Sequence, residues 1–355
     1  MDKALPKYML VQNKIKEGIE SGQIADKLPG ERALAKELDI SYMTVRKAIE
    51  NLVQEGVLYK VPTKGTFVNR SGVVQKATRN IGFFLDDRVE GAISSPYYSL
   101  IFKALEREAL KNNYHLIYFS NFSDLDPLKS ASKIDGIVIS CFSRLEDRIQ
   151  ELKNRLPVVL IGNSAADKSI PSVIIDNFSG IVDAMEYLRS LGHSRIGFIT
   201  GLLDSDVGKN RLRGYQSALN KFGIEEDGEL IFEGDYSYDS GAQGAARFLA
   251  LSNPPTAILC ANDSMAIGAT KVIREQGRHV PEDMSIIGFD DIAVASQVYP
   301  PLTTVAAPVK EIAAHSIKKL ISLIDGVEPD DKHMALSAQL IIRGSCASIT
   351  ENVMA

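Results

Sequence analysis

Three side chains in the second half of the chain are well suited to binding hydroxyl groups: Arg211, Asn262 and Asp290. A guanidinium donates through a fixed fork of N–H groups, a carboxylate accepts at two oxygens, and an amide does both. Vicinal hydroxyls of a small polar ligand such as a sugar need this combination. Aromatic faces for the C–H groups of such a ligand would come from Tyr97, Tyr98 and Tyr236.

Buried strands are expected to place these groups. The apolar run 257–261 is interrupted by Asn262, a helical segment follows to Gln276, and a second apolar run, 285–289, ends at Asp290. This pattern predicts a βαβ unit with polar residues at both strand ends, where open parallel sheets bind ligands. A third predicted strand, 195–200, precedes a helix that we expect to open at Lys209. We assign Arg211 to the strand-end loop at this point.

Helix capping is an alternative role for some of these polar residues. For Asp263 or Ser264, a cap on the following helix is as good an explanation as a ligand contact. Asp290 has Asp291 beside it, and two carboxylates are more than one cap needs. Arg213 is expected to be a surface charge and Tyr238 to lie at the rim.

Three stretches of this region, PTAILCANDSMAIGA, VPEDMSIIGFDD and PPLTT, resemble the effector domain of the lactose/galactose repressor (LacI/GalR) family. The resemblance covers about residues 80–349 and implies the fold of periplasmic sugar-binding proteins. It implies effector contacts for four residues: Arg211, Tyr236, Asn262 and Asp290. In the first lobe it points to the strand ends at Ser140 and Gly162, where Gly162 replaces an aspartate often found in the family, so no known sugar is assigned.

Strands and helices alternate through the whole body, which predicts a doubly wound α/β fold. We expect a first lobe over about residues 80–176 and 306–326, and a second over about 177–305 and 327–350. In this scheme the segment 333–343 closes the second lobe. Either Tyr97 or Tyr98 faces the cleft, and the sequence leaves open which.

The first 69 residues predict a winged helix-turn-helix. Helical periodicity spans 8–21, a short helix follows Gly30, and Ser41 is a good N-cap for a third helix. Two short strands, 57–60 and 66–68, flank a turn. The third helix would enter a major groove of DNA with its N-terminal residues toward the bases.

Several residues of this head are candidates for DNA contact. The exposed residues at the start of the third helix are Tyr42, Met43, Thr44, Arg46 and Lys47. Arg46 suits a guanine or a phosphate, and its alternative is a salt bridge with Glu50 at i+4. Lys64 and the Gly65 backbone form the expected tip of the wing.

The stretch KLPGERALAKELDISYMTVRKAIENLVQEGVL, followed by KGTFV, resembles the DNA-binding domain of the GntR family. That resemblance implies DNA contacts for Arg32, Ser41, Thr44, Arg46 and Gly65. For Arg32 the alternative is an exposed residue on a solvated face. Gly30 replaces a capping serine, and Tyr42 replaces a base-reading arginine, so operator preference is expected to differ. A GntR head on a LacI/GalR body resembles regulators of the arabinose-repressor type.

Charge is uneven along the 355 residues. Residues 1–79 hold 14 basic and 9 acidic side chains, a net charge of +5, whereas the whole chain carries −5. A basic head on an acidic body favours a polyanion partner for the head alone.

The three cysteines and five histidines lack metal-site spacing, and no nucleophile elbow or phosphate loop occurs, so we expect no enzyme, metal or cofactor.

The sequence therefore predicts a ligand-responsive DNA-binding regulator with a head (1–69), a linker (70–79) and an effector and dimerisation domain (80–350). We expect a cytoplasmic homodimer without membrane contact, which binds a palindromic operator and is released by a sugar. The alternatives are a purine or other metabolite as effector, or a sugar receptor of a transport system, which a signal peptide would indicate. The effector, the operator and the sign of regulation stay open.

Overall fold

The computed structural model describes residues 6–54, 57–61, 65–68, 78–86, 91–121, 134–140 and 146–349. The chain forms two compact units, 1–78 and 79–355. We call them the head and the body. Most of the predicted linker, Lys64 and Cys141 lie outside the described residues.

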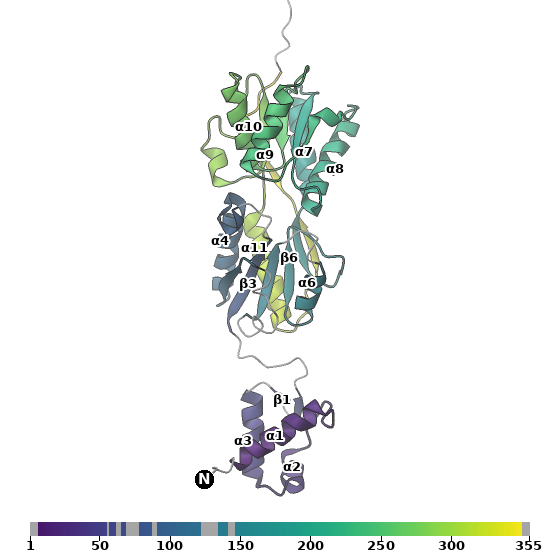
Figure 1. Ribbon diagram of the computed structural model, residues 1–355, viewed down its shortest axis with the longest axis vertical. Coiled ribbons are helices and arrows are strands. Elements are labelled where there is room, and N and C mark those ends of the chain that lie inside the picture. Colours follow the sequence, from purple (N-terminus) through teal and green to yellow (C-terminus); the bar gives the residue numbers. More distant parts are fainter. Residues whose placement is uncertain are drawn as a thin grey trace, which may run out of the picture. The chain divides into compact units, whose positions relative to one another are not determined.

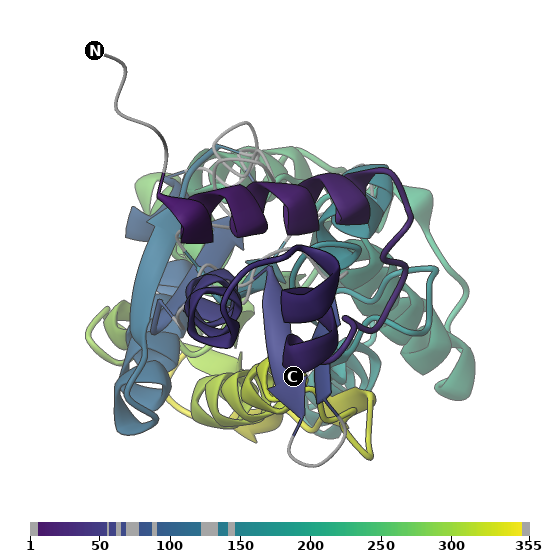
Figure 2. The same cartoon turned by 90° about the horizontal axis from the view of Figure 1, so that it is seen from below.

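The described residues of the head form three helices and a two-stranded antiparallel sheet, as the winged helix-turn-helix prediction required (Figures 1 and 2). Its elements are α1 (Lys7–Glu20), α2 (Glu31–Glu37), α3 (Tyr42–Gln54), β1 (Leu58–Val61) and β2 (Gly65–Val68). One apolar side of each helix supplies the core, which includes Val11 and Ile15 from α1, Leu34 from α2, and Val45 and Ile49 from α3.

Ser41 caps α3, because its Oγ accepts a hydrogen bond from the N–H of Thr44 at 3.2 Å. Gly30, at the start of α2, gives no side-chain cap. This agrees with the sequence, because a glycine in place of serine has no side chain to cap the helix.

Within the part of the body that the structure describes, there are two six-stranded sheets, one in each lobe. The first-lobe sheet is parallel throughout, in the order β13-β7-β6-β5-β3-β4. Its strands are β3 (Asn80–Leu85), β4 (His115–Phe119), β5 (Gly136–Ser140), β6 (Val158–Ile161), β7 (Ser172–Ile175) and β13 (His333–Leu336).

The second-lobe sheet has the order β14-β12-β11-β10-β8-β9 and is parallel except for its edge strand β14. Its strands are β8 (Ile196–Thr200), β9 (Ile231–Glu233), β10 (Ala257–Cys260), β11 (Ser285–Asp290), β12 (Thr303–Ala306) and β14 (Gln339–Ile341).

Helices cover both faces of each sheet, so the doubly wound prediction is confirmed (Figure 1). The first lobe has α4 (Pro96–Lys111), α6 (Glu146–Lys153) and α11 (Val309–Ile324). The second has α7 (Asn177–Ser190), α8 (Asp206–Lys221), α9 (Tyr238–Leu249) and α10 (Asp263–Glu275). Short 3₁₀ turns are η1 (Ala92–Ser94), η4 (Gly228–Leu230) and η5 (Ala293–Ser296).

Two local predictions are corrected. The segment 333–343 does not lie in the second lobe as a whole, because β13 pairs with β7 in the first-lobe sheet and only β14 joins the second. Both strands are short and half exposed, so their own apolar pattern does not select a sheet. The sequence also predicts a strand over 229–233, but this segment begins within the 3₁₀ turn η4, and only 231–233 is extended.

Candidate functional site

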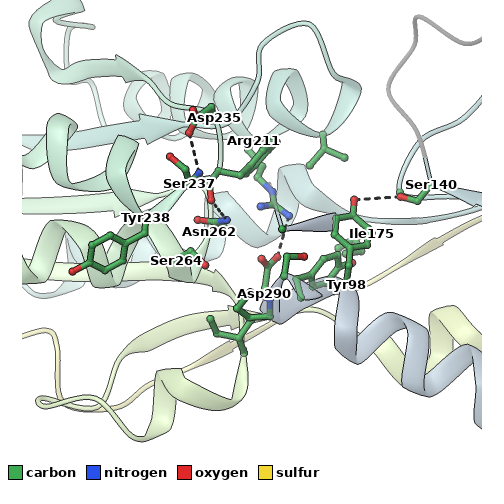
Figure 3. A pocket seen from close by; sticks show the side chains of 18 of the residues that line it. Tyr98, Ser140, Ile175, Arg211, Asp235, Ser237, Tyr238, Asn262, Ser264 and Asp290 are labelled. Atoms are coloured by element: carbon green, nitrogen blue, oxygen red, sulfur yellow. Dashed lines mark hydrogen bonds and ion pairs between the residues drawn. The ribbon is translucent and has the colours of Figure 1, made fainter. Parts of the chain in front are cut away.

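A pocket of about 580 Å³ lies between the two lobes of the body. Residues from both lobes line it, and all six side chains predicted to bind the effector are among them: Tyr97, Ser140, Arg211, Tyr236, Asn262 and Asp290. The fold therefore gathers residues that are up to 193 positions apart in the sequence. Figure 3 shows this pocket from close by.

The sequence predicts a strand-end loop for Arg211, but the residue lies inside helix α8. Helix α8 begins at Asp206, where the Oγ of Ser205 caps it by accepting from the N–H of Gly208 at 3.0 Å. Helical spacing turns residue 211 toward the pocket, and the whole residue is only 4% exposed. The sequence prediction started the helix three residues late.

Arg211 is fixed by several neighbours. Its Nε donates to Asn177 Oδ1 at 2.8 Å, one terminal nitrogen donates to the carbonyl of Ala261, and the other lies 3.6 Å from Asp290 Oδ1. The guanidinium stacks on the ring of Phe289, 3.6 Å from its centroid. The fork of Arg211 therefore presents a preorganised cation beside a carboxylate (Figure 3).

Asp290 ends β11, and its φ of 108° lies in the left-handed region that asparagine and glycine tolerate best. Only 7% of this residue is exposed. Burial raises the pKa of Asp290 to about 7, although the charge of Arg211 acts in the opposite direction. At neutral pH the carboxyl is therefore poised to accept or donate a hydrogen bond, which suits a ligand hydroxyl.

Asn262 has two contacts within the protein. As the N-cap of α10, its Oδ1 accepts from the N–H of Met265 at 2.9 Å, and its Nδ2 donates to the carbonyl of Tyr236 at 2.9 Å. The amide keeps its second N–H and an oxygen lone pair for a ligand. Capping and ligand contact are therefore compatible roles for this residue.

Asp263 is fully buried and has a structural role. Its Oδ2 accepts from the N–H of Ile292 at 2.8 Å, and its Oδ1 is hydrogen-bonded to the hydroxyl of Thr304. These contacts tie the start of α10 to β12 and to the segment after β11. Burial, aided by the charge of Asp290, raises the pKa of Asp263 to about 8.

The first-lobe wall is aromatic and apolar. Tyr97 and Tyr98 both line the pocket, and their rings meet edge to face with centroids 5.1 Å apart. The hydroxyl of Tyr98 is hydrogen-bonded to Ser140 Oγ at 3.2 Å (Figure 3). Ile161 and Ile175 extend this wall, and Gly162, with a φ of +79°, also lines it.

Three contributors to the site were missed by sequence reasoning. Asp235 Oδ1 accepts from the N–H of Ser237 at 2.9 Å, which holds the turn where Tyr236 has a φ of 72°. Gly201 lies under the ring of Tyr236, and a Cβ at residue 201 would overlap that ring. Ser95 lines the pocket, and its buried hydroxyl has no hydrogen-bond partner within the described ranges. Of these three residues, only Gly201 could have been found from the sequence, because it directly follows a predicted strand.

We expect Gly201→Ala to destabilise the body by about 1–3 kcal/mol, because the added methyl group must displace the Tyr236 ring. In a Tyr236→Ala background the same change should cost much less, since the clash is removed. Urea unfolding of the four variants measures both costs. Gly228→Ala, which meets nothing within 4 Å, is the control. Equal costs in the two backgrounds would refute the packing argument.

The predicted DNA-contact residues lie on the exposed side of the head, with Lys64 outside the described residues. Exposed positions include Arg32, Ser41, Tyr42, Arg46, Lys47 and Gly65, whereas Thr44 is partly buried. Arg46 forms the alternative salt bridge: its Nε lies 2.9 Å from Glu50 Oε1, and both side chains are 49% exposed. Such an exposed pair contributes little and is easily exchanged for a phosphate or base.

Two absences concern only the part of the chain that the structure describes. No group of three or more histidine, cysteine, aspartate or glutamate side chains there has the geometry of a metal site. In the same residues, no helix combines the length and the apolar character needed to cross a membrane.

Comparisons with known proteins agree with this architecture. Residues 7–68 match the model for bacterial regulatory proteins of the gntR family, and residues 185–346 match the periplasmic binding protein-like domain. The HTH-type transcriptional repressor CytR of Escherichia coli K12 is 32% identical over 341 residues, covering 89% of this chain and 96% of CytR.

Solved structures are similar as well. A regulatory protein of the LacI family from Chloroflexus aggregans has a TM-score of 0.65 and 32% identity, over 77% of this chain and all of that one. A LacI family regulator from Enterococcus faecium, solved with bound ribose, has a TM-score of 0.69 and 27% identity, over 76% of this chain and all of that one. The chain therefore belongs to the LacI family of transcriptional regulators, with a gntR-family DNA-binding domain over residues 7–68.

Proposed function

We propose that this DNA-binding regulator is a repressor controlled by a small uncharged sugar, which binds between the lobes of the body. The observation that carries the proposal is the convergence of Arg211, Asn262 and Asp290 on one pocket. These groups offer donors and acceptors spaced for neighbouring hydroxyls, while Tyr97 and Tyr236 offer aromatic surface. The ribose bound to the relative from Enterococcus faecium supports a ligand of this class.

Charge favours a neutral ligand. Among the described residues that line the pocket, Arg211 is the one cation, and Asp290 already faces it at 3.6 Å. An anionic ligand such as a sugar phosphate would have to compete with this carboxylate and would also meet Asp235. An uncharged polyol needs no such displacement.

The mechanism that follows is a shift between two arrangements of the lobes. A sugar held by Arg211 and Asp290 of the second lobe and by Ser140 and the tyrosines of the first favours the closed arrangement. The sugar alters DNA affinity only to the extent that it binds the two arrangements differently, typically 5- to 150-fold. Release from DNA is the response we propose. Since transcription is the regulated process, the protein acts in the bacterial cytoplasm.

Two heads, one from each protomer of a dimer, act together on DNA in this proposal. We propose that two bodies associate and present two heads to the half-sites of a palindromic operator, through Arg32, Ser41, Tyr42, Thr44, Arg46, Lys47, Lys64 and Gly65. A single head is only mildly basic, with a net charge of +4 over residues 1–78, and has too few contacts for tight binding by itself. Sedimentation should find a dimer at micromolar concentration. A monomer that binds its operator tightly would contradict this assembly.

The sugar proposal is tested by a thermal-shift screen of the full chain against monosaccharides, disaccharides, sugar phosphates, nucleosides and nucleobases. A neutral sugar should raise the melting temperature in proportion to its concentration over Kd. Stabilisation by a nucleobase or a sugar phosphate alone would replace the proposed effector class.

Arg46→Ala is expected to weaken operator binding about ten- to a hundredfold, because one guanidinium contact per head is lost. Effector binding should not change, since residue 46 belongs to the head. Fluorescence anisotropy with labelled operator at fixed salt measures the first effect, and isothermal titration with the effector measures the second. Parental operator affinity in Arg46→Ala would mean that α3 is not the recognition helix.

A further inference from the structure

Met43 is the second residue of α3 and the most exposed large apolar side chain of the described head, at 67%. Residues at this end of a recognition helix approach the base edges in the major groove. Four other apolar side chains of α3, Val45, Ala48, Ile49 and Leu52, are fully buried in the head's core, and Val53 is partly buried. The helix therefore presents an unbranched apolar group where DNA readers usually present a polar one.

The polar groups around Met43 already have partners. Thr44 is hydrogen-bonded to Ser41 at 2.7 Å, Arg46 pairs with Glu50, and the ammonium of Lys47 lies 4.7 Å from the centroid of the Tyr8 ring. Tyr42 contacts Glu31: the ammonium of Lys60, and to a smaller extent the Tyr42 hydroxyl, lower the pKa of that glutamate.

Base readout through Arg46 or Lys47 requires exchange of these contacts, whereas Met43 needs none. The one apolar feature that base pairs display in the major groove is the C5-methyl group of thymine. A flexible thioether chain adapts well to such a small apolar target.

We propose that Met43 reads the methyl group of a thymine in each operator half-site and so determines operator sequence at that base pair. This inference rests on the proposed function, because it requires the head to bind DNA. The contact buries apolar surface on both sides without desolvating a polar group. It specifies thymine against cytosine, which lacks the methyl group.

The test uses the full chain and a random-sequence duplex library. Sequences enriched by the parent chain define the operator, and each thymine of that operator is then replaced in turn by uracil, which removes only the methyl group. At one thymine of each half-site, replacement by uracil in a single half-site should weaken operator binding about fourfold. The same replacement in both half-sites should weaken it roughly fifteenfold. Met43→Ala should bind the thymine and uracil operators equally well.

Leu110→Ala is the matched control, since Leu110 is an aliphatic residue of the body with 53% exposure. It should keep the parental preference for thymine over uracil. The role of Met43 would be overturned if Met43→Ala lost as much affinity on uracil substitution as the parent, or if the parent lost none at any thymine. Neither result would touch the proposal that the head binds DNA. Failure of the parent to enrich any sequence would instead overturn DNA binding by this chain.

Discussion

Arg211→Lys is expected to abolish the response of operator binding to the effector while the body stays folded. Lysine keeps a positive charge beside Asp290 but has one ammonium in place of the planar fork. It cannot serve Asn177, the carbonyl of Ala261, Asp290 and a ligand together. We expect effector affinity to fall by about two orders of magnitude and ligand-free operator binding to change less than twofold.

Arg211→Ala should also cost stability. It leaves the buried Asp290 without its cation and removes the donor to Asn177, and breaking a buried pair in this way typically costs about 3–5 kcal/mol. Urea unfolding measures this cost, and operator titrations with and without effector measure the response. A Lys variant that responds at the parental effector concentration would remove Arg211 from the ligand contacts. Arg213→Lys, on the exposed side of the same helix, is the control.

Asp263→Ala is expected to destabilise the body by about 2–6 kcal/mol. The substitution leaves the N–H of Ile292 and the hydroxyl of Thr304 unsatisfied in the interior, and each such orphan costs about 1–3 kcal/mol. Asp263→Asn should be close to neutral at pH 7, because an amide oxygen accepts from Ile292 and its N–H₂ donates to Thr304. Denaturant unfolding of the three proteins compares these costs. Equal costs for alanine and asparagine would contradict the hydrogen-bonding role.

The same pair of variants predicts a pH dependence. The pKa of Asp263 is about 8 in the folded body, above its ordinary value of 3.8, with Asp290 and Asp291 as the nearby acidic groups. A raised pKa stabilises the fold fully below about pH 4, and this contribution is lost as pH rises toward 8.

The parent should therefore lose stability between pH 4 and 8 more steeply than Asp263→Asn. A pKa that is higher by one in the folded than in the unfolded state corresponds to about 1.4 kcal/mol of unfolding free energy. Asp290, whose pKa is about 7, leaves some slope in the variant. Unfolding free energies measured at several pH values test this difference, and parallel pH profiles would refute the assignment.

Sequence reasoning predicted the strand–helix–strand unit from Ala257 to Asp290 because its apolar runs and capping residues are local signals. The wing and the three helices of the head were predictable for the same reason. The edge strand β13 was not, because its pairing with β7 joins residues that are 161 positions apart in the sequence. Short strands with little burial carry no local record of their partner.

The site residues follow the same division. Asn262 and Asp290 stand at strand ends, a position that apolar periodicity reveals, and both line the pocket. Arg211 was placed in a loop because α8 begins with polar residues, whose helical phase no apolar stripe marks. Gly201 and Asp235 act through Tyr236, and a contact between distant segments leaves no pattern in either one.

The most direct test of sugar-controlled DNA binding is a titration of the full chain against its selected operator at fixed salt, with and without the sugar that stabilises it most. We predict that a sugar concentration just sufficient to saturate the parent weakens operator binding about 5- to 150-fold in the parent and has little effect on operator binding by Arg211→Lys. An operator affinity that is the same with and without the stabilising sugar in the parent chain would contradict the account.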